Sequence, residues 1–308
     1  MGPAVHPRVS GAPAHGLPTR AGVGPSCVGL PAGPWPTITD FLVEHFPAIS
    51  RATWLARMAS GQVADEFGVA VTPGRAYQGH MRVYYYRDVP DEPLIPFEAR
   101  VVFQDRHLVV ADKPHFLPVT PSGPYLQQTL LVRLKNALAI DTLVPIHRID
   151  RETAGLVMFS VEPAERDAYQ ALFRQHAIEK HYEAIAPWHA GHRFPMVRTS
   201  RIVQDEPFFR QREAAGEPNS ETRIELMEKR GDLARYALSP VTGRKHQLRV
   251  HMNALGVPIL NDRMYPPVSP TPADDYSFPL QLLARSIAFT DPVTGQGRRF
   301  ESAFKLQH

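Results

Sequence analysis

A charged loop that runs directly into an apolar segment is the feature of this sequence that most restricts its fold. Residues 147–153 read His-Arg-Ile-Asp-Arg-Glu-Thr, and residues 156–161 read Leu-Val-Met-Phe-Ser-Val. A short apolar run of this kind is typical of a buried strand, so we expect Asp150 on a loop that leads into the core. Arg148 and Arg151 should hold Asp150 ionised, because nearby positive charge stabilises a carboxylate.

The charge pattern alone leaves two interpretations of this loop open. An Arg-Asp-Arg cluster is more often a structural ion network than an active site, since structural networks also shift pKa values. Glu152, the second acid, is expected to face solvent. Thr153-Ala154-Gly155 supplies small residues where a backbone or a ligand could approach closely. A functional interpretation therefore needs support from other parts of the chain.

Composition permits a large globular protein with an affinity for nucleic acid. The chain has 308 residues, of which 43% are hydrophobic, and 34 basic against 31 acidic residues give a formal net charge of +3. This balance allows RNA binding but does not demand it. Cys27 is the only cysteine, so an intrachain disulfide and thiolate zinc sites are excluded. With no long apolar run and no signal-like N-terminus, we expect a cytoplasmic protein without a membrane span.

The N-terminal part divides into three predicted segments. Residues 1–35 are dense in Pro, Gly and Ala and contain no acidic residue, which predicts a disordered leader. Alternatively, translation starts downstream of Met1. Residues 36–90 predict two helices and a small sheet, with Thr39 or Asp40 capping the first helix and a second helix after Ser50. Residues 91–96 form a proline-rich linker.

Residues 97–308 predict a second, larger domain of mixed strands and helices. Strands are expected at 101–105, 107–111 and 178–186, and helices at 129–138 and after Glu162. A second notable stretch, residues 243–262, should open with a helix that starts at Thr242 or Gly243. Its exposed Arg244 and Lys245 are suited to phosphate contacts, while Arg249 can reach Asp150.

Two histidines of that stretch do not suggest a metal site. His246 and His251 are five residues apart, which puts them on different faces of a helix. Taken alone, they are better explained as hydrogen-bonded packing residues.

These motifs together resemble the RluA-type pseudouridine synthases over residues 97–305. The loop around Asp150 resembles the family's His-Arg-Leu-Asp-Arg signature, and residues 243–251 resemble its Gly-Arg-Thr-His-Gln-Ile-Arg-Val-His motif. Residues 180–182 resemble Lys-x-Tyr, and residues 112–114 resemble the family's Asn-Lys-Pro or Asp-Lys-Pro. Departures are Ile149, then Phe116 and Thr120 where the family commonly has Gly and His, and Leu283 in place of a His. Residues 36–90 resemble an S4 RNA-binding module.

The resemblance implies an α+β pseudouridine synthase fold: a large, mainly antiparallel mixed sheet flanked by helices and loops, preceded by a small S4-like α/β module. Asp150 is implied as the catalytic aspartate. Tyr182 is implied to stack on the target base and to assist proton transfer, and Arg249 to pair with Asp150. Leu282 would wall the base pocket. The residues expected to bind substrate are Leu282, His147, Arg148, Arg151, Arg244, Lys245 and His246.

The function implied is isomerisation of specific uridines to pseudouridine in ribosomal or transfer RNA, without a cofactor or metal. Asp150 would either attack the nucleoside or abstract a proton as the glycosidic bond breaks. The main alternative is a catalytically silent RNA-binding or assembly factor on the same fold. A more distant one is a hydrolase that uses Asp150 as nucleophile. A monomer is expected.

Overall fold

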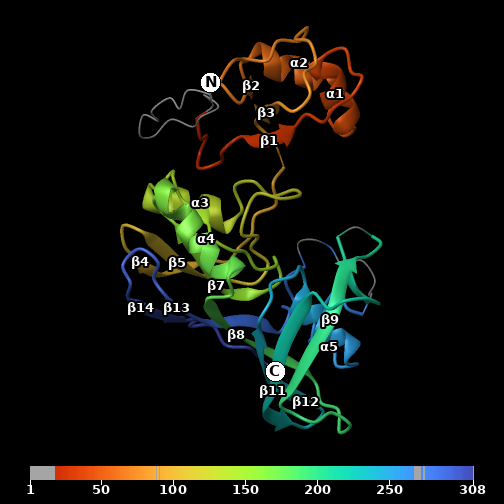
Figure 1. Cartoon of the computed structure of the whole chain (residues 1–308), viewed down its shortest axis with the longest axis vertical. Helices are drawn as coiled ribbons and strands as arrows, with labels where there is room; N and C mark the ends of the chain where they lie inside the picture. The colour runs from red at the N-terminus through yellow and green to blue at the C-terminus, as the bar shows by residue number, and fades with distance from the viewer. Residues whose placement is uncertain are drawn as a thin grey trace. The chain divides into compact units, whose positions relative to one another are not determined.

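The computed structural model describes residues 18–87, 89, 91–207, 209–266, 272 and 275–307. These residues form two compact units (Figure 1). The first unit holds the described residues up to Glu92 together with Lys135–Asp141, and the second holds Pro93–Leu134 and those from Thr142 onward. Within the described residues, no helix is long and apolar enough to cross a membrane.

The first unit has the predicted succession of two helices and a small sheet. Its elements are β1 (Ser26–Gly29), α1 (Ile38–His45), α2 (Arg51–Ala59), β2 (Val63–Asp65) and β3 (Arg82–Tyr85). The strands pair antiparallel in the order β1-β3-β2. A capping box joins Thr37 and Asp40 at the start of α1, so the helix is capped by Thr37 and not by Thr39 or Asp40. Ser50 caps α2, as predicted.

Two predictions for this unit are wrong. The proposed disordered leader over 1–35 includes β1, which pairs with β3, and Leu30, which is buried; residues 1–17 lie outside the described residues. The sequence Tyr84-Tyr85-Tyr86 suggests an edge strand of mixed burial, yet β3 is the central strand and Tyr85 packs into the core of the unit. Backbone pairing on both sides of β3 explains why its tyrosines are largely buried.

The acidic pair in this unit is neutralised internally. The Asp65 carboxylate is buried, accepts hydrogen bonds from the backbone N–H groups of Phe67 and Val69, and pairs with Arg75 at 2.6 Å. Glu66 pairs with Arg82. These acids therefore do not place an unpaired negative charge in the unit. The likeness to an S4 RNA-binding module stays a prediction.

The second unit is built on one mixed sheet of eleven described strands. Its strand order is β10-β9-β11-β12-β8-β13-β7-β5-β4, with β14 beside β13 and β6 beside β7, and β13–β7 is its parallel pair. The strands are β4 (Arg100–Gln104), β5 (Leu108–Lys113), β6 (Val144–Pro145), β7 (Ala154–Ser160), β8 (Ile178–Pro187), β9 (Met196–Gln204), β10 (Gln211–Ala214), β11 (Ser220–Arg230), β12 (Leu233–Pro240), β13 (Leu282–Thr290) and β14 (Gly297–Glu301). The predicted large, mainly antiparallel mixed sheet is confirmed.

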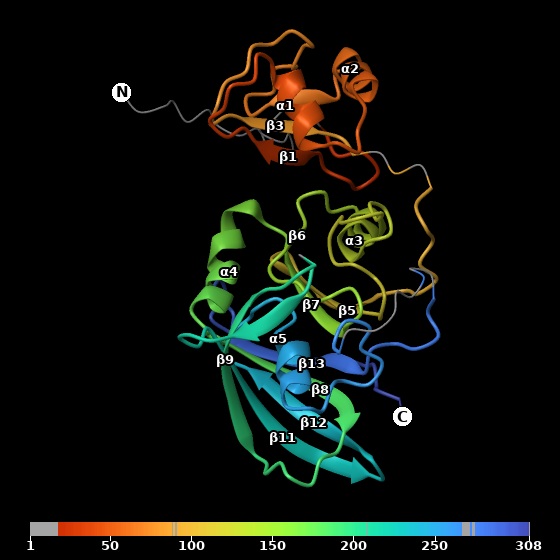
Figure 2. The same cartoon turned by 90° about the vertical axis from the view of Figure 1, so that its right-hand side faces the viewer.

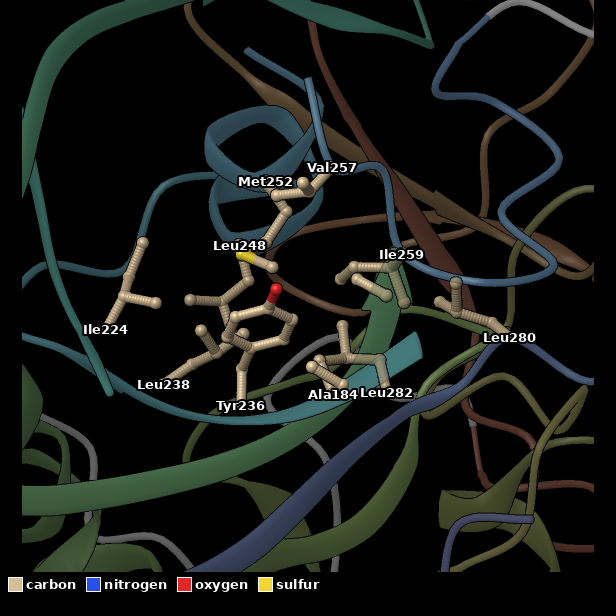
Figure 3. Close-up of a cluster of buried hydrophobic side chains, with 12 residues drawn as sticks. Ala184, Ile224, Tyr236, Leu238, Leu248, Met252, Val257, Ile259, Leu280 and Leu282 are labelled. Carbon is tan, nitrogen blue, oxygen red and sulfur yellow. The ribbon is translucent and has the colours of Figure 1, made fainter. Parts of the chain in front are cut away.

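Helices cover this sheet at two places (Figure 2). Helix α5 (Gln247–Ala254) packs Leu248 and Met252 against Tyr236 and other apolar side chains of β8, β11, β12 and β13 (Figure 3). A 3₁₀ turn, η1 (Pro163–Glu165), leads into α4 (Arg166–Arg174), which packs over β5, β7 and β13. The residues of helix α3 (Leu130–Leu138) are assigned to both units, up to Leu134 to the second and from Lys135 to the first. The apolar face of α5 fixes which way its polar side chains point.

The parallel crossing of β7 and β13 depends on Gly155. This glycine has φ +113°, and a Cβ there would lie 2.3 Å from the carbonyl oxygen of Ala284. Residues other than glycine rarely adopt such a φ. The close approach sets the position of β7 and hence of the loop that precedes it.

We predict that Gly155→Ala lowers the free energy of unfolding by about 3 kcal/mol, because the added methyl group meets backbone atoms that cannot move aside cheaply. Gly297→Ala is the matched control. Its Cβ would meet nothing within 4 Å, so a change within about 0.5 kcal/mol is expected. Urea unfolding of both variants measures the difference, and equal stabilities would contradict the tight crossing.

Candidate active site

Asp150 lies on the loop that joins β6 to β7, at the wall of a small cavity. The loop is closed by a hydrogen bond from the Thr153 N–H to the Asp150 carbonyl oxygen, 3.1 Å long. The cavity has a volume of about 110 Å³. Its lining comes from this loop, β8, the end of β12, the start of α5 and β13, and comprises Arg148, Ile149, Asp150, Thr153, Lys180, Tyr182, Pro240, Thr242, Gly243, Arg244, His246, Gln247, Leu248, Arg249 and Leu282.

Arg249 joins Asp150 to a second carboxylate. Its Nη1 donates to Asp150 Oδ2 at 3.1 Å, which is the contact that the sequence predicted. Its Nε and Nη2 donate to the two oxygens of Asp262 at 2.8 and 2.7 Å. The side chains of Arg249 and Asp262 are each only 1% exposed, whereas that of Asp150 is 27% exposed. Arg249 is therefore fixed by Asp262 and presents its remaining nitrogen to Asp150.

The pKa of Asp150 lies below its ordinary value of 3.8. Burial by itself would raise this pKa, but interactions with His246, Arg249 and Lys113 together lower it by more. The ion pair comes from Arg249, far along the chain, as the family resemblance implied, and not from the adjacent arginines that the charge pattern alone suggested. At neutral pH the site thus holds a carboxylate.

Arg151 and Glu152 pair with each other instead. Arg151 Nη1 lies 2.8 Å from Glu152 Oε1, and the Glu152 side chain is only 12% exposed. The expectation that Glu152 faces solvent is therefore wrong. Arg151 also lies over the ring of Tyr125, with 5.3 Å between its Cζ and the ring centroid. These contacts assign Arg151 to bracing the loop, and it does not line the cavity.

His246 lies between Tyr265 and Asp150. Its Nδ1 is 2.8 Å from Tyr265 Oη, which also accepts a hydrogen bond from the Gln211 N–H at 2.7 Å. Its Nε2 lies 3.8 Å from Asp150 Oδ1. Burial is the main cause that lowers the pKa of His246 to about 4, so the ring is neutral at pH 7.

Lys113 anchors the loop of Asp150 from inside the protein. It is fully buried, and its Nζ donates to the carbonyl oxygens of Pro114 and Arg151 at 2.9 and 3.1 Å. Burial lowers its pKa to about 7, against the opposing effect of Glu152 and Asp150. Sequence reasoning missed this role, although a lysine that ends an apolar strand was a usable signal.

Tyr182 and Leu282 line the cavity beside Asp150. Burial, with a further contribution from the negative charge of Asp150, raises the pKa of Tyr182, so its phenol is protonated at neutral pH. Leu282 is 3% exposed and also belongs to the core cluster under α5. The next residue, Leu283, which replaces a family histidine, packs into the core with Ala154, Ile185 and Leu306. The change at Leu283 therefore leaves the cavity wall intact.

Not all of the remaining residues predicted to bind substrate line the cavity. Arg148, Arg244 and His246 line the cavity, whereas Lys245 does not. His147 lines a neighbouring groove. Helix α5 begins at Gln247, not at Thr242 or Gly243, because His246 adopts a left-handed conformation with φ +56°. Arg244 therefore lies on the loop before the helix, where Gln247 Oε1 accepts a hydrogen bond from its backbone N–H.

Both histidines of this motif are hydrogen bonded, as predicted. His251 is buried, with Nε2 at 3.0 Å from the hydroxyl groups of Ser200 and Ser220, and Nδ1 at 2.9 Å from that of Thr222. Across the described part of the chain, no group of three or more His, Cys, Asp or Glu side chains is arranged to hold a metal ion.

The fold is shared with solved structures. Human RNA pseudouridylate synthase domain containing 1 aligns with a TM-score of 0.55 and 21% identity, over 70% of this chain and 86% of that one. Human RNA pseudouridylate synthase domain containing 4 aligns with a TM-score of 0.52 and 24% identity, over 67% of this chain and 88% of that one. The chain is therefore a protein of the pseudouridine synthase fold.

Sequence comparison gives the family within that fold. The family model for RNA pseudouridylate synthase matches residues 107–254. The dual-specificity RNA pseudouridine synthase RluA of Haemophilus influenzae is 33% identical, over 68% of this chain and 94% of its own length. An uncharacterized RNA pseudouridine synthase of Synechocystis is 28% identical, over 74% of this chain and 79% of its own. The chain belongs to the RluA-type RNA pseudouridine synthases, isomerases that make pseudouridine in RNA.

We predict that Arg249→Met lowers the free energy of unfolding by about 3–5 kcal/mol, because the buried Asp262 loses its partner. Adding Asp262→Asn should restore at least half of that loss, since the uncompensated charge is then gone. Urea unfolding at pH 7 measures both effects.

The control is Arg299→Met. Arg299 pairs with Glu301 at the surface, where the side chains are 58% and 53% exposed, so a loss below about 1 kcal/mol is expected. If Arg249→Met lowers the free energy of unfolding by no more than Arg299→Met does, the buried pair does not stabilise the site.

Proposed function

We propose that Asp150 is the catalytic residue of this synthase and acts on a uridine flipped out of the RNA into the cavity beside it. The observation that carries the proposal is a partly exposed, ionised carboxylate at the wall of a cavity of about 110 Å³, a size suited to one pyrimidine ring. Enzymes that alter a base need such a pocket, because the reacting atoms are inaccessible within a stacked strand.

Tyr182 and Leu282 hold the base in this proposal. Both line the cavity, one through a flat ring and the other through an apolar side chain. Because its phenol is protonated, Tyr182 can donate a proton, but it cannot accept one until it has lost its own. Arg249 acts by keeping Asp150 ionised and in place.

The reaction breaks the bond between uracil N1 and ribose C1′ and forms a bond between uracil C5 and C1′. Asp150 either attacks the nucleoside or abstracts a proton to start the cleavage. The uracil is released from the ribose, rotates and rejoins C1′ through C5; N1 gains a proton, and the hydrogen on C5 leaves as a proton. The product is an isomer of the substrate, so no water is consumed in the net reaction and no cofactor takes part.

The RNA is ribosomal or transfer RNA in this proposal. The family resemblance implies these two classes, and relatives such as the dual-specificity RNA pseudouridine synthase of Haemophilus influenzae support RNA as the substrate. Arg148 and Arg244, exposed at the mouth of the cavity, are suited to contacts with phosphate.

We predict that Asp150→Asn abolishes pseudouridine formation, with a rate at least about 1,000-fold lower, because the amide can neither attack nor accept a proton. RNA affinity should change by less than about threefold, since few phosphate contacts are lost. The measurement is tritium release from bulk RNA labelled at uridine C5, taken from cells that lack the gene. Glu301→Gln, at a surface pair on β14, is the control and should keep full activity. Turnover by Asp150→Asn would refute the assignment.

A further inference from the structure

A larger groove continues from the cavity of Asp150. It has a volume of about 600 Å³ and is lined by Ile146, His147, Arg148, Phe173, Arg174, His176, Lys180, Tyr182, Thr242, Gly243 and Arg244. The cavity and the groove share several of these residues, namely Arg148, Lys180, Tyr182, Thr242, Gly243 and Arg244. A ligand that fills the cavity can therefore extend into the groove without leaving the protein surface.

The groove is positively charged. Among the described residues that line it, none carries a carboxylate, whereas Arg148, Lys180 and Arg244 are cationic. Arg174 also lines the groove, but it pairs with Asp167 at 2.8 Å. Lys180 Nζ donates to the Thr242 carbonyl oxygen at 3.2 Å, which leaves further N–H groups for a ligand. Arg148 is exposed and has no described carboxylate within ion-pair distance. This lining favours an anionic chain.

An aromatic surface lies in the same groove. The rings of Phe173, on α4, and His147 stack with centroids 4.7 Å apart and an interplanar angle of 22°. His147 Nε2 accepts a hydrogen bond from the Met158 N–H at 3.2 Å, which fixes the imidazole. Burial lowers the pKa of His147 to about 3, so the supporting ring is uncharged at neutral pH. Phe173 is thus a half-buried ring that His147 supports on one face.

We propose that this groove is a second nucleotide subsite, in which the base next to the flipped uridine stacks on Phe173 and the intervening phosphate contacts Arg148 and Lys180. The inference rests on the proposed function, because it takes the uridine in the Asp150 cavity as the starting point. Flat rings bind nucleobases of any sequence through their faces, while cations follow the backbone. An acidic peptide would satisfy the cations but would leave the ring without a stacking partner.

The test compares Phe173→Leu with Phe173→Tyr. Leucine keeps an apolar side chain for the packing of α4 but has no ring face, whereas tyrosine keeps the ring. With bulk RNA from cells that lack the gene, we expect Phe173→Leu to raise the KM for tritium release about tenfold at unchanged kcat, as lost base stacking would. Phe173→Tyr should restore the KM to within twofold.

Phe103→Ala is the matched control for lost packing. Phe103 is also half-buried against the same core cluster, but it does not line the groove. Its KM should match that of the wild type even if its melting temperature falls. If Phe103→Ala raises the KM as much as Phe173→Leu does, the proposal is overturned, because lost packing alone would then explain the rise in KM.

Binding separates this proposal from the catalytic one. In the Asp150→Asn background, filter retention gives the Kd for the same RNA over a range of salt concentrations. Phe173→Leu should weaken binding about tenfold with an unchanged salt slope, since stacking releases no counterions, whereas Arg148→Gln should reduce the slope by about one. Unchanged affinity in Phe173→Leu overturns the subsite even if Asp150→Asn is inactive. Turnover by Asp150→Asn overturns the catalytic role and leaves the affinity comparison standing.

Discussion

The buried guanidinium of Arg249 is the interaction on which the site depends. It is held by two hydrogen bonds to Asp262 and offers a third to Asp150. A buried arginine is stable only when its charge and its donors are satisfied. Because Asp262 meets most of that requirement, Asp150 can stay partly exposed at the cavity while still lying beside a fixed positive charge. The arrangement separates the group that stabilises the arginine from the group that faces the cavity.

The fold delivers these groups from distant parts of the chain. Helix α5 is fixed by its apolar side chains on the sheet, which directs Arg249 toward the loop of Asp150. On the opposite side of that loop, β7 passes β13 at Gly155, and Lys113 bonds to the loop's backbone. The same loop opens the groove that contains Phe173. The position of Asp150 is thus fixed by backbone packing as much as by charge.

Much of the larger domain could be predicted from its sequence because its strands are apolar runs and its motifs are long. The buried strand after Asp150 and the contact with Arg249 are present as expected. The partners of Arg151 and Glu152 were not predictable, since neighbouring charges in sequence say little about side-chain direction. Asp262 was missed as a partner of Arg249 because only the tertiary fold brings them together. In the smaller unit, composition suggested disorder where pairing with β3 orders β1.

The central claim, that Arg249 keeps Asp150 ionised, is tested most directly by titrating Asp150 itself. Carbon-13 NMR of side-chain-labelled aspartate, with the Asp150 signal assigned by its absence in Asp150→Asn, gives the pKa in the wild type and in Arg249→Met. We predict a pKa below 3.8 in the wild type and a higher value once the guanidinium is gone. A wild-type pKa at or above 3.8, or one that does not change in Arg249→Met, would contradict the account.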